Sequence, residues 1–271
     1  MNYNNSDKSI FYLGGLPRSG STLLCNILAQ NPSLFVTKAT SGCSELIFRI
    51  KNNWDNIIEH KAEGINYNQL VNVLRGVLNS YHLTDKKFII DKSRSWTGMI
   101  DTIKYMTNFQ PKIIVPVRNI NEILASFEKL WRQSSGLSSW TFAPEDQPLA
   151  QTTEGRCDLW ANMRYPVGSA FNKIRDAIDR GYKKDLFFVE FDDLTQRPSY
   201  TMQKIYEYLE LPTFDHDFNN IVQMTEEDDI GVHKIPNLHK IRPKVEPIPF
   251  YSQDILGINL SQKYSNLEIW R

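Results

Sequence analysis

Short apolar runs separated by longer stretches of helical periodicity are the feature that most restricts how this chain can fold. They read IFYL from Ile10, KFIID from Lys87, KIIVPVR from Lys112 and DLFFVEF from Asp185, with a shorter run at Phe35–Val36. Their lengths and sharp ends are typical of buried strands. Strands this apolar that alternate with helices predict a parallel sheet with both faces covered. We therefore expect an α/β fold with a P-loop-like parallel sheet and helices on both faces.

The stretches between the predicted strands carry apolar residues at helical spacing. Each stretch predicts one helix packed against the sheet, and Ser44 is the expected cap of the second of them. The predicted apolar faces span Ile120–Trp131, Leu46–Ile57, Met163–Ile178 and Met202–Leu209.

The length of 271 residues suits one large α/β domain, and we expect a single domain over 1–271. Residues 134–153, rich in Ser, Pro, Gln and Thr, form the one long predicted loop, which we interpret as a candidate mobile lid. The patterns typical of helices and strands are weak after about residue 225, so 225–271 is expected to be an irregular, basic flap on the sheet edge.

The overall charge argues against a polyanionic partner. Lys plus Arg equals Asp plus Glu at 31 each, so a nucleic acid held by bulk charge is excluded and any basic site must be local. The three cysteines match neither a metal motif nor an even disulfide framework, which is typical of a reducing compartment. No apolar run reaches the roughly 18 residues of a membrane span, and the N-terminus lacks a signal-peptide core. We expect a cytoplasmic protein without membrane insertion.

A glycine-rich turn, GGLPRSGST, follows the first predicted strand. Gly15 and Gly20 give the spacing G-x-x-x-x-G-S-T, which is that of a phosphate-binding P-loop with Ser21 in place of the lysine. Backbone N–H groups of such a turn and the following helix N-terminus bind anions, and Arg18 adds a positive charge. The alternative is a turn that only caps the helix.

The hexapeptide PRSGST resembles the 5′-phosphosulfate loop, P-[RK]-[ST]-G-[ST]-[ST], of sulfotransferases that use 3′-phosphoadenylyl sulfate (PAPS). Its GGLPRSGSTLL context is most similar to the tyrosylprotein and bacterial branches. The resemblance implies that PAPS is the co-substrate and that its 5′-phosphosulfate is held by Pro17, Arg18, Ser19, Gly20, Ser21 and Thr22.

A second element supports the resemblance. In the family, a strand ending in V-R leads into a helix with a serine eight residues later, and both side chains bind the 3′-phosphate; here they are Arg118 and Ser126. An arginine at a strand end can fork onto a phosphate. The alternatives are a sheet-edge ion pair for the arginine and helix packing for the serine. A further basic residue of the family's helix is Leu130 here, and the expected substitute is Lys129 or Arg132.

The resemblance also implies a catalytic set. Lys92 in FIIDKSRSW aligns with a lysine beside the transferring sulfonyl group, where a fixed cation stabilises developing charge. Arg94 is a candidate contact for the acceptor. Without the other motifs, this Lys-Ser-Arg would be read as a solvated turn.

Removal of the acceptor proton needs a general base. The tyrosylprotein branch uses a glutamate shortly after the second strand. That glutamate falls near Lys38 when the Asn31–Pro32 pair is aligned, and the carboxylate available in the segment is Glu45. We therefore predict the catalytic residues Arg18, Lys92 and Glu45; the alternative for Glu45 is a carboxylate that favours a helix N-terminus.

No metal is expected. The tail GVHKIPNLHKIRPKV resembles the family's basic loop over the nucleotide, which implies roles for Lys240 and Arg242. His233 and His239, six residues apart, are not a typical metal pair. Asp192 and Asp193 are interpreted as helix-capping residues.

These features together predict a PAPS-dependent sulfotransferase that moves a sulfonyl group in line to a hydroxyl of a small molecule or a peptide. The first alternative is a kinase that uses ATP and Mg²⁺, against which Ser21 argues because the P-loop lysine is missing. The second is a non-catalytic protein that binds the product 3′,5′-adenosine diphosphate (PAP). Aromatic residues that could form an acceptor pocket wall, or belong to the core, are Trp96, Trp131, Trp140 and Phe142.

Overall fold

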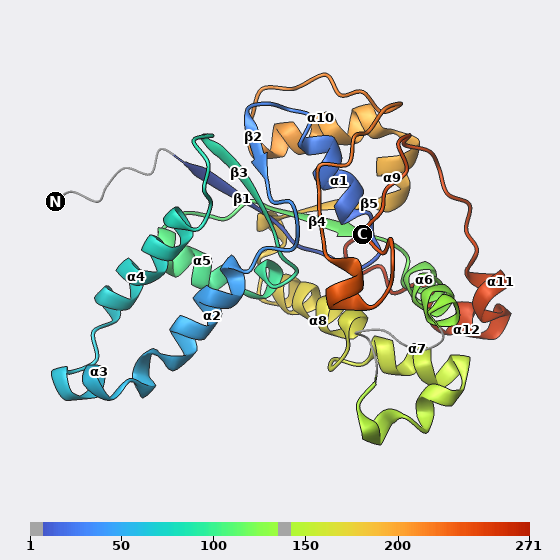
Figure 1. Ribbon diagram of the computed structural model, residues 1–271, viewed down its shortest axis with the longest axis horizontal. Helices are drawn as coiled ribbons and strands as arrows, with labels where there is room; N and C mark the ends of the chain where they lie inside the picture. The colour runs from blue at the N-terminus through green and yellow to red at the C-terminus, as the bar shows by residue number, and fades with distance from the viewer. Residues whose placement is uncertain (1–7, 135–141) are drawn as a thin grey trace.

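The computed structural model of the chain describes residues 8–134 and 142–271. Its centre is a sheet of strand order β2-β3-β1-β4-β5, in which neighbouring strands are parallel (Figure 1). The expected α/β fold and the predicted strands are confirmed. The strands are β1 (Ser9–Leu13), β2 (Leu34–Val36), β3 (Phe88–Lys92), β4 (Ile113–Val117) and β5 (Leu186–Glu190).

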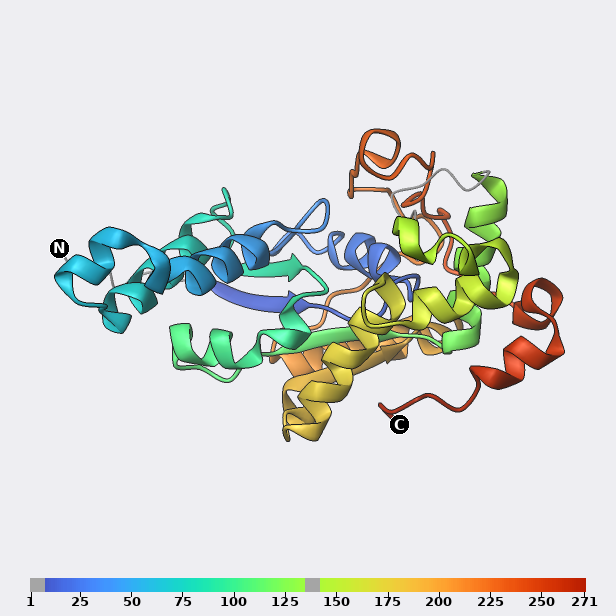
Figure 2. The same ribbon diagram turned by 90° about the horizontal axis from the view of Figure 1, so that it is seen from below.

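Helices cover both faces of this sheet. Successive strand residues point to opposite sides, and apolar residues on both sides need cover. In β1, Phe11 and Leu13 join one hydrophobic cluster and Tyr12 joins the other. The first cluster packs under α1 (Ser21–Leu28), α9 (Phe191–Gln196) and α10 (Pro198–Leu209) (Figures 1 and 2). The second packs against α2 (Cys43–Asn53), α4 (Tyr67–Ser80), α5 (Ile100–Thr107), α6 (Ile120–Gln133), α7 (Thr153–Ala161) and α8 (Pro166–Asp179).

The predicted helix after residue 44 differs in detail from α2. The helix begins at Cys43, whose backbone N–H donates to the Ser41 hydroxyl, so Ser44 is not the cap. The Ser44 hydroxyl instead lies 2.8 Å from that of Ser93. The helix ends at Asn53 and is followed by the short helices η1 (Trp54–Asn56) and α3 (Ile58–Glu63). This shift leaves Leu46 exposed, whereas its neighbour Ile47 is buried.

The mobility expected of the predicted lid stays a prediction, but residues 142–153 are packed on the helices beside them. Phe142 is buried in the second cluster, in ring contact with Trp131 and Trp160. The chain then forms the turns η3 (Pro144–Asp146) and η4 (Leu149–Gln151). The aromatic contacts hold this part against α6 and α7. Residues 135–141 of the predicted lid, with Trp140, lie outside the described residues.

The C-terminal segment is irregular only in part. Between α10 and residue 251 the chain has a single π-helical turn, η6 (Asp229–His233). Residues of the segment 225–242 contact the loops after β1, β2 and β3. Two helices follow, α11 (Ser252–Leu256) and α12 (Ile258–Lys263), and both contact α6. The remaining short helices are η2 (Trp96–Gly98) and η5 (Lys183–Asp185). No helix in the described ranges has the length and apolar character to cross a bilayer.

The loop after β1 is packed directly on β4. The amide N–H of Gly14 donates to the carbonyl of Ile114 and that of Leu16 to the carbonyl of Pro116, both at 2.9 Å. Gly15, between them, has φ +105°, and a Cβ there would lie 2.4 Å from the Pro116 oxygen. Only glycine fits this position, because a side chain would meet both an unfavourable backbone angle and a backbone clash.

This close approach predicts that Gly15→Ala lowers the free energy of unfolding by about 2–4 kcal/mol. Gly76→Ala is the matched control, since Gly76 lies within α4 and no atom would meet its Cβ within 4 Å. In that helix, alanine should raise the free energy of unfolding by about 0.5–1 kcal/mol. Urea unfolding measures both, and effects of the same sign would contradict the argument.

Candidate active site

A cavity of about 910 Å³ lies at the carboxyl ends of β1, β3 and β4. This edge of a parallel sheet is where ligands usually bind. In the described parts of the chain, basic side chains outnumber carboxylates around it, although the whole protein has no net charge. The cavity therefore favours an anion. Its charged lining is Arg18, Lys92, Arg94, Arg118, Lys129, Lys240, Arg242 and Lys244, with Glu226, Glu227, Asp228 and Glu246.

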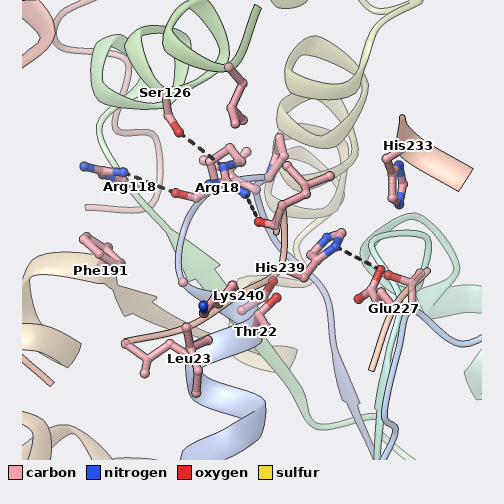
Figure 3. A pocket seen from close by; sticks show the side chains of 18 of the residues that line it. Arg18, Thr22, Leu23, Arg118, Ser126, Phe191, Glu227, His233, His239 and Lys240 are labelled. Atoms are coloured by element: carbon pink, nitrogen blue, oxygen red, sulfur yellow. Dashed lines mark hydrogen bonds and ion pairs between the residues drawn. The ribbon is translucent and has the colours of Figure 1, made fainter. Parts of the chain in front are cut away.

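The cavity brings most of the predicted site residues together (Figure 3). Two of them, Ser19 and Glu45, do not line it. Those that do are Pro17, Arg18, Gly20, Ser21, Thr22, Lys92, Arg118, Ser126, Lys240 and Arg242.

Arg18 connects three parts of the cavity. Its backbone is left-handed, with φ 57°. Its Nε lies 3.2 Å from the Ser126 hydroxyl on α6, and its Nη1 donates to the carbonyl of Leu238 at 3.1 Å. The loop, α6 and the C-terminal segment therefore meet at one guanidinium (Figure 3).

The Ser19 side chain faces the sheet. It is fully buried, and its hydroxyl lies 2.5 Å from the carbonyl of Leu16 and 2.9 Å from that of Pro116. The hydroxyl stabilises the turn, so a contact of Ser19 with a bound anion would use its backbone N–H. Gly20 precedes α1, whose N-terminus borders the cavity and favours negative charge there.

Arg118 is held on several sides but keeps a buried nitrogen without a partner. Its guanidinium carbon lies 4.6 Å from the ring centre of Phe191 and 5.6 Å from that of Tyr251. Its Nη2 lies 3.4 Å from a carboxylate oxygen of Glu122. Its Nε is buried and has no hydrogen-bond partner among the described residues. A guanidinium oriented in this way, with an unused donor, fits an added phosphate oxygen.

Glu122 links Arg118 to the C-terminal segment. The residue is 1% exposed, and its second carboxylate oxygen accepts the backbone N–H groups of Tyr251 (3.1 Å) and Ser252 (2.9 Å). One buried carboxylate thus fixes the start of α11 beside the arginine. Sequence reasoning did not find Glu122, although its i,i+4 spacing from Arg118 is a signal for such a pair.

Lys92, the last residue of β3, reaches into the cavity from the opposite side. Its Nζ lies 2.8 Å from Glu227 Oε1 and 3.5 Å from the Thr22 hydroxyl. Its neighbour Asp91 is completely buried and accepts hydrogen bonds from Ser41 and Trp96. These contacts fix the strand end, so the ammonium is held next to the loop.

The aromatic residues considered for an acceptor pocket belong to the core where the structure describes them. Trp96 is fully buried, and Trp131 packs with Phe142 in the second hydrophobic cluster. The aromatic side chains that line the cavity are Phe127, Phe191 and Tyr251. They lie after β4, after β5 and after the irregular segment. At these positions the spacing of apolar residues does not separate a cavity-lining aromatic from a core aromatic.

Segment 225–242 carries functional candidates that sequence reasoning missed, above all Glu227. The segment is anchored on Asn26, whose side-chain oxygen accepts the backbone N–H groups of Met224 and Thr225. The backbone N–H of Glu226 donates to the carbonyl of Lys38 at 2.9 Å. Glu227 then enters the cavity with a side chain 8% exposed. The acidic run EEDD, immediately before the basic tail, was the available signal.

Glu227, His233 and His239 place one ligand atom each within 4.8 Å of one another, the only such group in the part of the chain described. However, Glu227 Oε1 contacts Lys92, and His239 Nδ1 lies 2.6 Å from Asp229 Oδ1. Burial alone would raise the pKa of Asp229, but hydrogen bonds from His239 lower it below its usual value. Glu227 and His239 therefore already have partners within the protein.

Of the remaining predicted residues, Glu45 and Arg132 do not line the cavity, whereas Lys129 does. Glu45 is in the first turn of α2 with a side chain 55% exposed, and it pairs with Arg49 at 2.7 Å. Arg132 turns away toward Glu128, whereas Lys129 lines the cavity. Lys129 as the additional phosphate contact, and Glu45 as the base, stay predictions.

The paired aspartates after β5 do not belong to the group formed by Glu227, His233 and His239. Asp192 and Asp193 occupy the first turn of α9, so they are not its N-cap, which is Glu190. Asp193 forms an ion pair with Arg197, four residues later in the chain.

The comparison with protein families places the chain. The sequence profile of the sulfotransferase family matches residues 10–216, which is more than half of the chain. The protein belongs to this family and is an enzyme of the sulfotransferase class. No curated protein matches the sequence.

Solved structures share the fold at low sequence identity. Mouse sulfotransferase SULT7A1, solved in complex with PAP, is 15% identical with a TM-score of 0.54, over 97% of this chain and 84% of its own. Sulfotransferase STF9 from Mycobacterium avium is 14% identical with a TM-score of 0.51, over 96% and 76%. The sulfotransferase domain of the Synechococcus PCC 7002 olefin synthase is 18% identical with a TM-score of 0.50, over 97% of both chains. At these identities the likeness shows the fold alone.

Two Arg–Glu pairs at the same helical spacing allow a matched test of the Glu122 link. We expect Glu122→Ala to lower the free energy of unfolding by about 3–5 kcal/mol, because it leaves Arg118 buried without its counterion. Glu45→Ala breaks the exposed pair with Arg49 and should change the free energy of unfolding by less than about 0.5 kcal/mol. Urea unfolding measures the difference. Faster hydrogen exchange at Tyr251 and Ser252 in Glu122→Ala alone tests the link itself, and unchanged exchange there would contradict it.

Proposed function

We propose that the protein uses PAPS as the sulfonyl donor. The observation that carries this proposal is the pairing of two anion sites in one cavity, one on the loop before α1 and one at Arg118, bridged by the Arg18–Ser126 contact. Such a pair suits a nucleotide with phosphates at both ends, and the unpartnered Nε of Arg118 suits the 3′-phosphate. The PAP complex of the mouse structure supports the same choice.

In this proposal each end of PAPS has its own residues. The N–H groups of the loop 17–22 and of the α1 N-terminus hold the 5′-phosphosulfate, with Arg18 as the charged side chain. Arg118 and Ser126 hold the 3′-phosphate. Lys240 and Arg242 close over the nucleotide from the C-terminal segment. No metal is required for this binding, because the cations are side chains.

Transfer moves the sulfonyl group from PAPS to a hydroxyl of a small molecule or a peptide. Lys92 lies next to Thr22 at the loop, so its ammonium stabilises the charge that develops on the sulfonyl and leaving oxygens. The acceptor hydroxyl must also lose a proton to a base. Glu45, the base predicted from sequence, would have to act from outside the cavity.

We also propose the cytoplasm as the place of action. The three cysteines, Cys25, Cys43 and Cys157, are all free and buried. Burial raises the pKa of the Cys25 thiol to about 11, which keeps it protonated and unreactive. Free thiols of this kind are compatible with a reducing compartment.

The nucleotide site is tested by calorimetric titration with PAP, AMP and Mg·ATP. PAP should bind about 10-fold to 100-fold more tightly than AMP, because hydrogen bonds to a charged phosphate contribute about 1.5–3 kcal/mol. Arg118→Ala should remove most of that preference. Arg164→Ala, an exposed arginine paired with Asp146, should leave it unchanged. Tightest binding of Mg·ATP would favour the kinase alternative, and tight PAP binding without sulfonyl transfer would favour a PAP-binding protein.

The role of Lys92 is tested by transfer of labelled sulfonyl from PAPS to phenol. We expect Lys92→Ala to lower kcat by about 10²-fold to 10³-fold, the usual effect of removing one charge-stabilising donor. PAP affinity should change much less, because the lysine acts on the group in transit. Lys61→Ala, on exposed α3, is the control. A loss of PAP affinity as large as the loss of kcat would place Lys92 in nucleotide binding instead.

A further inference from the structure

Glu227 is the carboxylate that the fold brings to the reacting end of the cavity. We propose that Glu227 is the general base that accepts the proton of the acceptor hydroxyl, an assignment that rests on the proposed sulfotransferase function. It is delivered by the C-terminal segment, not by the loop after β2 (Figure 3).

The argument begins with distance. Lys92 Nζ lies 3.5 Å from the hydroxyl of Thr22, the last residue of the predicted phosphosulfate loop. The same Nζ lies 2.8 Å from Glu227 Oε1. An ammonium has three donors, so it can contact a sulfonyl oxygen and the carboxylate together. This arrangement places the carboxylate beside the sulfur that the acceptor must approach.

The carboxylate is also held in position. Its side chain is 8% exposed, and its second oxygen, Oε2, lies 3.5 Å from Nδ1 of His239. His239 is fixed in turn by Asp229. One carboxylate oxygen of Asp229 contacts the His239 Nδ1, and the other accepts the backbone N–H of His239. A base bound at one oxygen by Lys92 and packed beside His239 at the other can meet an acceptor at a defined angle, which a mobile surface carboxylate cannot do.

The other carboxylates that line the described cavity have different partners. Glu226 is 79% exposed and lies near Lys38. Asp228 accepts the backbone N–H of Gly231 within the π-helical turn. Glu246 pairs with Lys244 at 3.0 Å. Glu227 is the one among these lining carboxylates that contacts Lys92.

The chemical step balances without a further reactant. The acceptor O–H bond breaks and its proton passes to Glu227, while the acceptor oxygen forms a bond to sulfur. The bond from sulfur to the bridging oxygen of PAPS breaks, and its electron pair leaves with PAP. The protonated carboxyl then returns its proton to solvent, and the enzyme is restored.

Glu227→Gln tests this assignment with two acceptors, phenol and p-nitrophenol. Glutamine keeps the shape and an oxygen for Lys92 but cannot accept the proton. At mildly alkaline pH phenol remains protonated and needs the base, whereas p-nitrophenol is largely ionised and does not. We expect Glu227→Gln to slow single-turnover transfer to phenol by about 10²-fold to 10⁴-fold, and transfer to p-nitrophenol only a few-fold. Hydrolysis of PAPS, in which water is the acceptor, should fall like the phenol rate and needs no organic acceptor.

Glu226→Gln, the exposed neighbour on the same segment, is the matched control. PAP affinity, measured in parallel, should stay within a few-fold in Glu227→Gln. Equal losses on both acceptors, a loss confined to Glu45→Gln, or turnover that a chelator abolishes and Zn²⁺ restores would each overturn the assignment. Failure of the wild-type protein to bind PAP would instead refute the proposed function itself.

Discussion

The packing of the loop after β1 on strand β4 determines where the rest of the site can be. Two backbone hydrogen bonds and the absence of a side chain at Gly15 bring the loop against Pro116. Arg118 follows the same strand two residues later. The loop and the arginine therefore share one support, and their relative positions do not depend on flexible connections. A glycine-rich loop carrying Arg18 and a strand end carrying Arg118, held at a fixed separation, are the direct result.

Ion pairs between buried cations and carboxylates explain how a protein without net charge can stabilise a cavity lined by so many basic side chains. Buried cations without partners are costly, and the chain places a carboxylate next to each deeply held one. Glu122 lies beside Arg118, and Glu227 lies beside Lys92. Both carboxylates also contact the C-terminal segment or belong to it, so the charge pairs position the wall of the cavity as well as neutralising it.

Local patterns in the sequence predicted the strands and the glycine-rich turn between β1 and α1, because each of these depends on neighbours within a few residues. The candidate residues Arg118 and Ser126 came instead from the resemblance to the sulfotransferase family, and their roles stay predictions. Side-chain direction could not be predicted where it depends on distant packing. The Ser19 hydroxyl turns toward β4, and Trp96, for which a pocket wall and the core were both open, turns toward buried Asp91. Glu227 could not be found in this way, since its contact with Lys92 joins residues 135 positions apart.

The contact between Arg18 and Leu238 spans 220 positions of the chain. Domains form from the N-terminus during synthesis at about 5–20 residues per second. The glycine-rich loop and its strand are therefore made well before the segment that completes the cavity. Until Leu238 has been made, Arg18 lacks its contact with that carbonyl, and the wall formed by residues 225–242 is missing from the cavity. Completion of the cavity therefore has to wait for a segment that lies far downstream of the loop in translation.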